Sequence, residues 1–180
     1  MTGLFDEIPV MKNERIVIRR ITDADADAIA AMTADGLVYR YLPTFLYEKQ
    51  FTDMHEMIRG LYGELFTSKE SMILGIYLKE DMSFCGMAEY YGYKETLHKV
   101  CVGYRLCRHC WGKGIATEAL SLLTRHVYND TDTQIITAST MIENRASARV
   151  LEKNGFIMTA SGVPEDWGYP EPTITDKWFG

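Results

Sequence analysis

The chain has 180 residues, 47% of them hydrophobic and 24% charged, with a formal net charge of −6, which suits a single globular domain spanning residues 1–180. Its acidic balance and scattered Lys and Arg residues argue against nucleic-acid binding, and no apolar run approaches the roughly 18 residues of a membrane helix. Because the N-terminus also lacks the apolar stretch of a secretory signal, we expect a cytoplasmic protein.

The N-terminal third predicts one strand followed by helices. Residues 15–21, RIVIRRI, alternate apolar and basic side chains, which is typical of a half-buried strand. Thr22 is a favourable N-cap for the helix that follows, acidic residues crowd its first turn, and Gly36 supplies a stop. After a break at Pro43, residues 47–66 carry apolar side chains at steps of three and four, which predicts one helix or two short ones.

A run of β-rich segments occupies the middle of the chain. Strands are predicted at 71–78, 84–93 and 99–107, separated by short polar turns. A helix is expected from about 114 to 128, because apolar residues recur on one face there. A further strand is predicted at 133–140.

The C-terminal region predicts a helix and two strands. Asn144 is placed as the N-cap and Gly155 as the C′ residue of a short helix. Strands are expected at 156–161 and 172–179, joined by the loop 162–172. For its residues 166–172 a plain surface loop is preferred over a lid or an edge contact. The strand–helix–strand order implies at least one parallel crossover, so the predicted fold class is an α/β sandwich around a mixed sheet.

The four cysteines, Cys85, Cys101, Cys107 and Cys110, are expected to be reduced thiols. Cys107 and Cys110 form a C-x-x-C pair, which leaves a zinc site or a redox pair open as alternatives. A four-cysteine zinc site needs two close pairs, whereas Cys85 and Cys101 are isolated in apolar runs typical of buried cysteines. We therefore expect no metal.

The stretch WGKGIATEAL, residues 111–120, places a glycine turn between a predicted strand and a predicted helix. Such a turn points backbone N–H groups outward at a helix N-terminus, where the helix dipole favours a phosphate or pyrophosphate. It is not a Walker A sequence, and Thr117 stands where the dinucleotide fingerprint G-x-G-x-x-G has its third glycine. Taken alone, the turn is equally compatible with a simple tight connection.

Several segments together are more specific than the turn. WGKGIATEAL, ENRASARVLEKNGF about thirty residues later, the opening ERIVIRRITDADADAI, VYRYL at 38–42 and GYRL before the turn resemble the GNAT superfamily of acyl-CoA N-acetyltransferases. The branch that the chain resembles is the ribosomal-protein N-terminal acetyltransferase type (RimJ/RimL-like). The resemblance covers nearly the whole chain. It implies a mixed, mostly antiparallel sheet of about six to seven strands flanked by helices, splayed between the strand before the CoA loop and the next strand.

The resemblance also implies where acetyl-CoA, the expected co-substrate, is held. Backbone groups near Leu106 and Arg108 would pair with the pantetheine arm, and the Leu106 amide would polarise the thioester carbonyl. The Arg108 side chain, where the family usually has proline, would reach a CoA phosphate or simply be exposed. Asn144 would contact the pantetheine arm, beside its role as an N-cap, and Ser147 would lie near the thiol or the phosphates. A loop that begins at Trp111 would cradle the pyrophosphate with the amides of Gly112, Lys113, Gly114, Ile115, Ala116 and Thr117.

The catalytic residues are less clear, because the chain departs from the family pattern. Leu151 stands where many members have a tyrosine general acid, which leaves Ser147 as the candidate acid or as a polar residue that supports the helix N-terminus. Cys101 stands where the branch often has an acidic residue, and Glu89 on the preceding strand is the candidate base. For Glu89 a surface strand glutamate is the preferred interpretation.

Other polar and aromatic residues give weaker indications. His98 and Glu143 are lesser candidates for the base, and water chains would make a base unnecessary. Tyrosines on two neighbouring strands either pack across the sheet or line an acceptor pocket; they are Tyr90, Tyr91, Tyr93 and Tyr104.

Three functions follow from these patterns. The leading hypothesis is an N-acetyltransferase that transfers acetyl from acetyl-CoA to a primary amine, either a small molecule or a protein N-terminus. The second is a non-catalytic acyl-CoA binder or sensor of the same fold, and the third is a metal or redox protein built on the C-x-x-C pair. The sequence leaves monomer and homodimer equally open.

Overall fold

A computed structural model describes residues 1–180, and its strands form one mixed eight-stranded sheet in the order β1-β2-β3-β4-β5-β6-β8-β7. The strands are β1 Met11–Lys12, β2 Ile16–Arg20, β3 Ser71–Leu78, β4 Phe84–Lys94, β5 Lys99–Leu106, β6 Ile135–Met141, β7 Ile157–Glu165 and β8 Thr173–Phe179. The helices are α1 Ala26–Ala34, α2 Met54–Glu56, α3 Tyr62–Thr67, α4 Ile115–Asp130 and α5 Arg145–Lys153. The α/β fold class is confirmed, with eight strands instead of six to seven.

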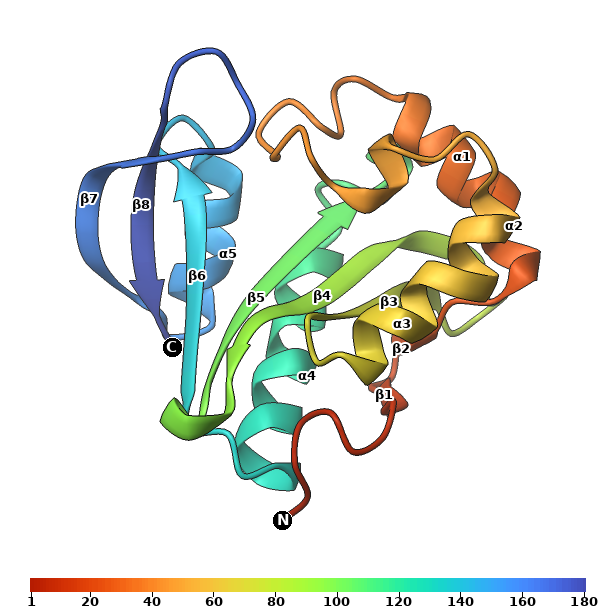
Figure 1. The fold of residues 1–180 in the computed structure, drawn as a ribbon, viewed down its shortest axis with the longest axis horizontal. Coiled ribbons are helices and arrows are strands. Elements are labelled where there is room, and N and C mark those ends of the chain that lie inside the picture. Colours follow the sequence, from red (N-terminus) through yellow and green to blue (C-terminus); the bar gives the residue numbers. More distant parts are fainter.

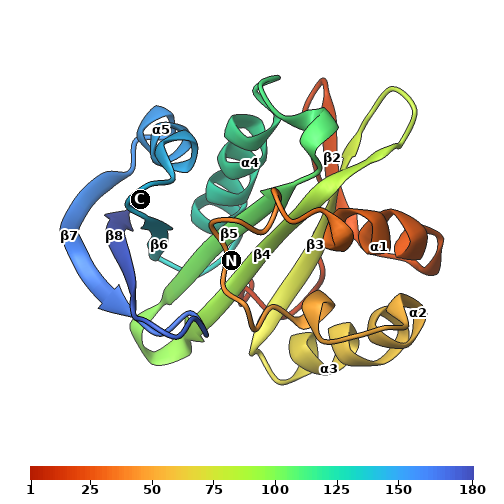
Figure 2. The same ribbon diagram turned by 90° about the horizontal axis from the view of Figure 1, so that it is seen from above.

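Helices cover both faces of the sheet, with α4 on one side and α2 and α3 on the other (Figure 2). Strand β3 shows how the sequence builds both cores, because its alternate side chains point to opposite faces. Leu74 and Ile76 pack into the cluster that includes Leu123 of α4, whereas Ile73 and Tyr77 pack into the cluster with the first three helices. A strand buried on both faces is therefore continuously apolar, as 71–78 is.

Strands β5 and β6 are parallel neighbours that separate after a short pairing (Figure 1). The pairing runs only from Lys99 opposite Ile135 to Cys101 opposite Thr137. The remaining strand pairs of the sheet are antiparallel. The predicted parallel crossover and the predicted splay are both confirmed, and we call the opening beyond Cys101 and Thr137 the β5–β6 gap.

The helical segment before β3 differs in detail from the prediction. A single 3-10 turn covers Tyr47–Lys49, and the helix proper begins at Met54, where α2 runs through a π-helical turn into α3. Asp53 starts it, since its carboxylate accepts from His55 N over 2.9 Å. The predicted stop at Gly36 is confirmed in position, because α1 ends at Ala34, Asp35 is its C-cap and Gly36 follows directly. Its geometry differs from the usual glycine stop, since Gly36 does not have a positive φ.

The C-terminal hairpin is longer than predicted. β7 continues through Glu165, so the connecting loop shortens from 162–172 to 166–172. The helix expected from Asn144 to Gly155 is confirmed, with Gly155 in the left-handed region at a φ of 80°. No helix of the chain combines the length and apolar character that crossing a bilayer requires.

Candidate active site

The glycine loop leads directly from β5 into α4. Gly112 and Gly114 have φ angles of 68° and 78°, a left-handed conformation that glycine adopts without steric cost. Gly114 is the N-cap of α4, and no side chain caps this end of the helix. The first amides of α4 are therefore available to an anion, and the helix dipole adds a partial positive charge there. This geometry fits a phosphate or pyrophosphate group.

Arg15 ties the glycine loop to the start of β2. Its Nη2 donates to the Lys113 carbonyl oxygen over 2.6 Å, and its Nε donates to Glu118 Oε1 over 2.7 Å. Asn13 Nδ2 donates to the other Glu118 oxygen over 3.0 Å. Sequence patterns could not reveal this contact, because it joins residues about a hundred positions apart that follow no local period.

A cavity of about 1480 Å³ follows the β5–β6 gap from the glycine loop to the loop after α1. Most of the predicted site residues line it: Glu89, Leu106, Trp111, Gly112, Gly114, Ile115, Ala116, Thr117, Asn144 and Ser147. Lys113 and Arg108 do not belong to the lining. The Arg108 side chain forms an ion pair with Asp35, and this hydrogen bond lowers the pKa of the Asp35 carboxyl.

Leu106 ends β5 beside the gap. Its neighbour Cys107 donates its amide to the Cys85 carbonyl over 2.8 Å, which completes the ladder to β4. The backbone N–H groups of successive strand residues point to opposite sides of the strand. Because the Cys107 amide points to β4, the Leu106 amide points to the other side, toward the gap. Trp111 Nε1 donates to the Leu106 carbonyl oxygen over 2.9 Å, so the side chain before the glycine loop also fixes the end of the strand.

The start of α5 brings two polar side chains to the cavity. Asn144 Oδ1 accepts from the Ser147 amide over 3.2 Å, which confirms Asn144 as the N-cap. Ser147 Oγ lies 3.0 Å from the Tyr104 hydroxyl of β5. Burial raises the pKa of Tyr104 to about 12. Leu151 lies one turn further along α5 and is buried.

Glu89 belongs to a buried ionic network, so the expectation of a surface glutamate is wrong. Its carboxylate accepts from Ser71 Oγ over 2.6 Å and from Arg105 Nη1 over 3.1 Å. Arg105 Nη2 also donates to Glu48 over 2.9 Å, and Glu48 accepts from the Tyr39 hydroxyl over 2.9 Å. Burial disfavours the Arg105 charge, but the two carboxylates offset it and raise its pKa above the usual value. Two carboxylates thus share one guanidinium beside the cavity.

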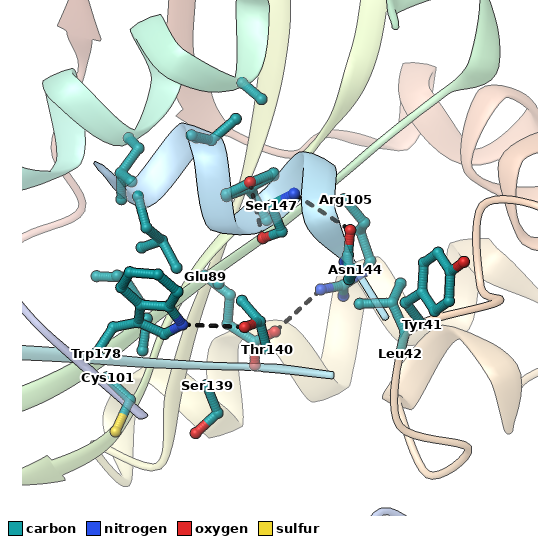
Figure 3. Close-up of a pocket in the computed structure, with 18 of the residues that line it drawn as sticks. Tyr41, Leu42, Glu89, Cys101, Arg105, Ser139, Thr140, Asn144, Ser147 and Trp178 are labelled. Atoms are coloured by element: carbon teal, nitrogen blue, oxygen red, sulfur yellow. Dashed lines mark hydrogen bonds and ion pairs between the residues drawn. The ribbon is translucent and has the colours of Figure 1, made fainter. Parts of the chain in front are cut away.

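Figure 3 shows how these groups lie. Asn144 and Ser147 project from the start of α5 into the cavity that Glu89 and Arg105 reach from the sheet. Sequence reasoning missed Glu48 and Arg105. The one available signal for Arg105 was its charge within the predicted strand 99–107. Its carboxylate partners, Glu48 and Glu89, lie in other segments of the chain.

Cys101 belongs to the last paired rung of β5 and β6, and His98 lies just before the first rung. Cys101 lines the cavity, and its Sγ lies 3.1 Å from Thr137 Oγ1. His98 is outside the lining, in a left-handed turn with Nδ1 3.8 Å from Asp132. Glu143, the other lesser candidate for the base, is also outside the lining.

The remaining cysteines are free thiols in the core. Cys85, Cys107 and Cys110 are buried, and the Cys110 amide donates to the Cys107 carbonyl over 2.9 Å. Burial raises the pKa of Cys107 to about 11 and that of Cys85 to about 12. Because thiolates are the reactive and metal-binding form, Cys85 and Cys107 are inert at neutral pH. This environment does not favour the redox or zinc interpretation of the C-x-x-C pair.

Two loops that line the cavity, one after α1 and one after β7, contact each other. The Thr44 amide donates to the Trp167 carbonyl over 2.8 Å, and the Tyr169 hydroxyl donates to the Leu42 carbonyl over 2.8 Å. In Figure 1 the loop after β7 extends toward the loop after α1. The expectation of a plain surface loop at 166–172 is therefore wrong, and an edge contact is observed.

The tyrosines of β4 and β5 divide between the core and the cavity. Tyr90 is fully buried and donates to the Leu123 carbonyl over 2.9 Å, and Tyr93 lies outside the cavity lining. Tyr91 and Tyr104 line the cavity, so only these two fit the expected acceptor pocket. The segment after α1 and the loop after β7 add further aromatic side chains to the lining: Tyr41, Phe45, Tyr47 and Trp167.

Comparisons with known proteins agree with this geometry. The model of the acetyltransferase (GNAT) domain matches residues 15–157. The uncharacterized N-acetyltransferase YoaA of Bacillus subtilis is 27% identical over 93% of this chain and 93% of its own length. The [ribosomal protein uS5]-alanine N-acetyltransferase of Escherichia coli is 22% identical over 87% of this chain and 83% of its own.

Solved structures share the same fold. A GNAT-family acetyltransferase from Bacillus anthracis superposes with a TM-score of 0.80 at 20% identity, covering 96% of this chain and 98% of the other. The spermidine N-acetyltransferase of Vibrio cholerae, in complex with CoA and spermine, superposes with a TM-score of 0.77 at 14% identity, covering 93% of this chain and 96% of the other.

Proposed function

The chain belongs to the GNAT acetyltransferase family, a family of acyl-CoA-dependent transferases, and we propose that it transfers the acetyl group of acetyl-CoA to a primary amine. The observation that carries this proposal is the β5–β6 gap beside an uncapped helix N-terminus. We propose residues 1–180 as a single catalytic domain. A monomer and a homodimer are both compatible with this site, because its proposed groups all come from one chain.

The donor would lie along the gap. Its pyrophosphate would rest on the loop from Gly112 to Thr117, where left-handed glycines and the dipole of α4 favour an anion. The pantetheine arm would take the place of a strand partner beside β5, with Asn144 on the opposite wall. The Leu106 amide would then donate to the thioester carbonyl as negative charge develops on its oxygen.

The reaction would proceed by direct attack of the amine. The nitrogen forms a bond to the acetyl carbon, and the electron pair of the broken C–S bond goes to sulfur. Glu89 is the proposed acceptor, directly or through water, of the proton that nitrogen loses, because its carboxylate lies at the cavity. Ser147 is the proposed proton donor to the sulfur. The sum is an amide and free CoA.

The acceptor would enter from the end where the two loops meet. Two similar proteins act on amines of different kinds: one is named for the alanine of ribosomal protein uS5 and the other for spermidine. These names support a primary amine in general. They do not choose between a protein N-terminus and a small molecule.

The experiment is an acetyl-CoA assay with a panel of amines. The purified protein is incubated with acetyl-CoA and, separately, with polyamines, amino acids and short peptides with free N-termini, and CoA thiol is measured. We expect at least one amine to raise thiol release above the hydrolysis seen without acceptor. Tight CoA binding without amine-dependent release across all classes of primary amine would favour the non-catalytic acyl-CoA binder, and failure to bind CoA would contradict both.

A further inference from the structure

The hydroxyl groups of Tyr104 and Ser147 lie 3.0 Å apart at the cavity wall, one on β5 and the other on α5. We propose that Tyr104 is a positioning residue for acetyl transfer, which donates its hydrogen bond to Ser147 Oγ and thereby leaves the single Ser147 proton free for the departing sulfur. This inference rests on the proposed function and adds to it a residue that the family resemblance did not indicate.

The direction of the hydrogen bond decides what Ser147 can do. A serine hydroxyl has one proton and two acceptor lone pairs, so a proton given to Tyr104 is not available to sulfur. The phenol of Tyr104 is more acidic than an aliphatic alcohol, which makes it the better donor of the two. The half-buried Tyr104 hydroxyl has Ser147 Oγ as its hydrogen-bond partner, and that oxygen has lone pairs with which to accept. Tyr104 is therefore the donor of the pair.

The backbones of Tyr104 and Ser147 are each held by neighbouring residues. Tyr104 stands opposite Ala88 in the ladder of β4 and β5. Ser147 is held at its amide by Asn144, in the first turn of α5. Leu151, one turn along α5, carries no proton to donate. Ser147 is thus the hydroxyl that the first turn of α5 brings to the cavity, with Tyr104 as its partner.

The protons balance without ionising Tyr104. Sulfur takes the Ser147 proton as the C–S bond breaks, and Glu89 takes the proton that the amine nitrogen loses. That proton then returns from Glu89 to Ser147 through water in the cavity. One proton has then moved from nitrogen to sulfur, as the overall reaction requires. Because burial raises the pKa of Tyr104 to about 12, the phenol keeps its proton near neutral pH throughout. Tyr104 acts by orienting Ser147, which distinguishes it from a general acid.

The test is a double-mutant cycle with Tyr104→Phe, Ser147→Ala and the double variant, assayed with acetyl-CoA and the best amine of the panel. Loss of one oriented hydrogen bond should lower kcat of Tyr104→Phe about tenfold and leave KM for acetyl-CoA within about twofold. In the Ser147→Ala background the same Tyr104→Phe change should have no further effect, because there is no hydroxyl left to orient. Tyr93→Phe, which removes a hydroxyl outside the cavity, is the matched control and should retain wild-type kcat.

A structural role for Tyr104 gives a different pattern. If Tyr104→Phe lowers kcat by the same factor with and without Ser147, or leaves kcat at the wild-type value, the proposal is wrong. The cycle remains decisive if a variant is less stable, because a general loss of stability lowers kcat in both backgrounds. An inactive wild-type protein with every amine would instead contradict the proposed function itself.

Discussion

Arg105 on β5 donates from Nη1 to Glu89 on β4 over 3.1 Å, with side chains only 3% and 8% exposed. Because Glu48 holds the same guanidinium, removal of Arg105 leaves two buried carboxylates without a counter-charge. We expect Arg105→Met to lower the free energy of unfolding by about 3–5 kcal/mol, the range typical of a broken buried ion pair. Urea unfolding followed by circular dichroism measures this.

The exposed pair of Lys69 and Glu95 is the control for Arg105→Met. Its side chains are 42% and 65% exposed, although the nitrogen and oxygen are only 2.9 Å apart. Solvent screens such a pair, so Lys69→Met should change the unfolding free energy by less than about 1 kcal/mol. Equal effects of the two substitutions would show that the buried network does not stabilise the fold.

A second prediction concerns the glycine loop. Gly114 has a φ of 78°, and an added Cβ would lie 3.3 Å from Arg15 Nη2. Gly114→Ala should therefore distort the loop and raise KM for acetyl-CoA about tenfold, since a left-handed alanine costs about 1–2 kcal/mol. Gly36→Ala is the control, because no atom lies within 4 Å of its added Cβ and its φ is not positive. An unchanged KM in Gly114→Ala would contradict a pyrophosphate site at this loop.

The contact between the two loops should control the acceptor. Gly168 has a φ of 85°, and an added Cβ would lie 1.9 Å from Thr44 Oγ1. Gly168→Ala should push the loops apart and raise KM for the amine several-fold. The donor site is at the other end of the cavity, so KM for acetyl-CoA should stay at the wild-type value. Initial rates measured against each substrate in turn give the two KM values separately. A change confined to KM for acetyl-CoA would contradict the placement of the amine at this contact.

Thiol labelling tests the environment of the cysteines. With pKa values raised by burial to about 11 and about 12, Cys107 and Cys85 remain thiols at pH 8 and should resist iodoacetamide in the folded protein. Cys101 lines the cavity and should react, and CoA should protect it. Peptide mass spectrometry identifies each labelled site. Rapid labelling of Cys85, or labelling of Cys101 that CoA leaves unchanged, would contradict this placement.

The same pKa shifts predict how stability depends on pH. A thiol whose pKa is higher in the folded than in the unfolded state stabilises the fold fully below the unfolded value, about 8.5. That contribution is lost as pH rises through the folded values of about 11 and about 12. The melting temperature should therefore fall between about pH 9 and pH 11. This fall should be smaller in Cys107→Ala than in the wild-type protein.

Local sequence patterns predicted the elements that frame the site. The alternation at 15–21, the glycine turn at 112–114 and the N-cap at Asn144 each depend on a few neighbouring residues, and each is present. The boundary that failed is the end of β7, predicted at residue 161 and observed at Glu165. It depends on pairing with β8, a contact that the local pattern does not contain.

Contacts between segments that are distant in the sequence could not be predicted from it. Glu48 and Arg105 are 57 positions apart, and Arg15 reaches Lys113 across 98 positions. Neither contact produces a periodic pattern in the sequence. The sequence also does not distinguish a buried glutamate from an exposed one. The family resemblance indicated the glycine loop and Ser147. It did not indicate Tyr104, because this contact joins β5 to α5 and depends on how the two elements pack.

Acetyl-CoA with a deuterated acetyl group tests the central claim most directly. The protein is incubated with this donor and the amine that gives the highest turnover, and the acceptor is analysed by tandem mass spectrometry. We predict one labelled acetyl group on an amine nitrogen for each CoA thiol released. Thiol release with an unlabelled acceptor and free deuterated acetate would contradict the account.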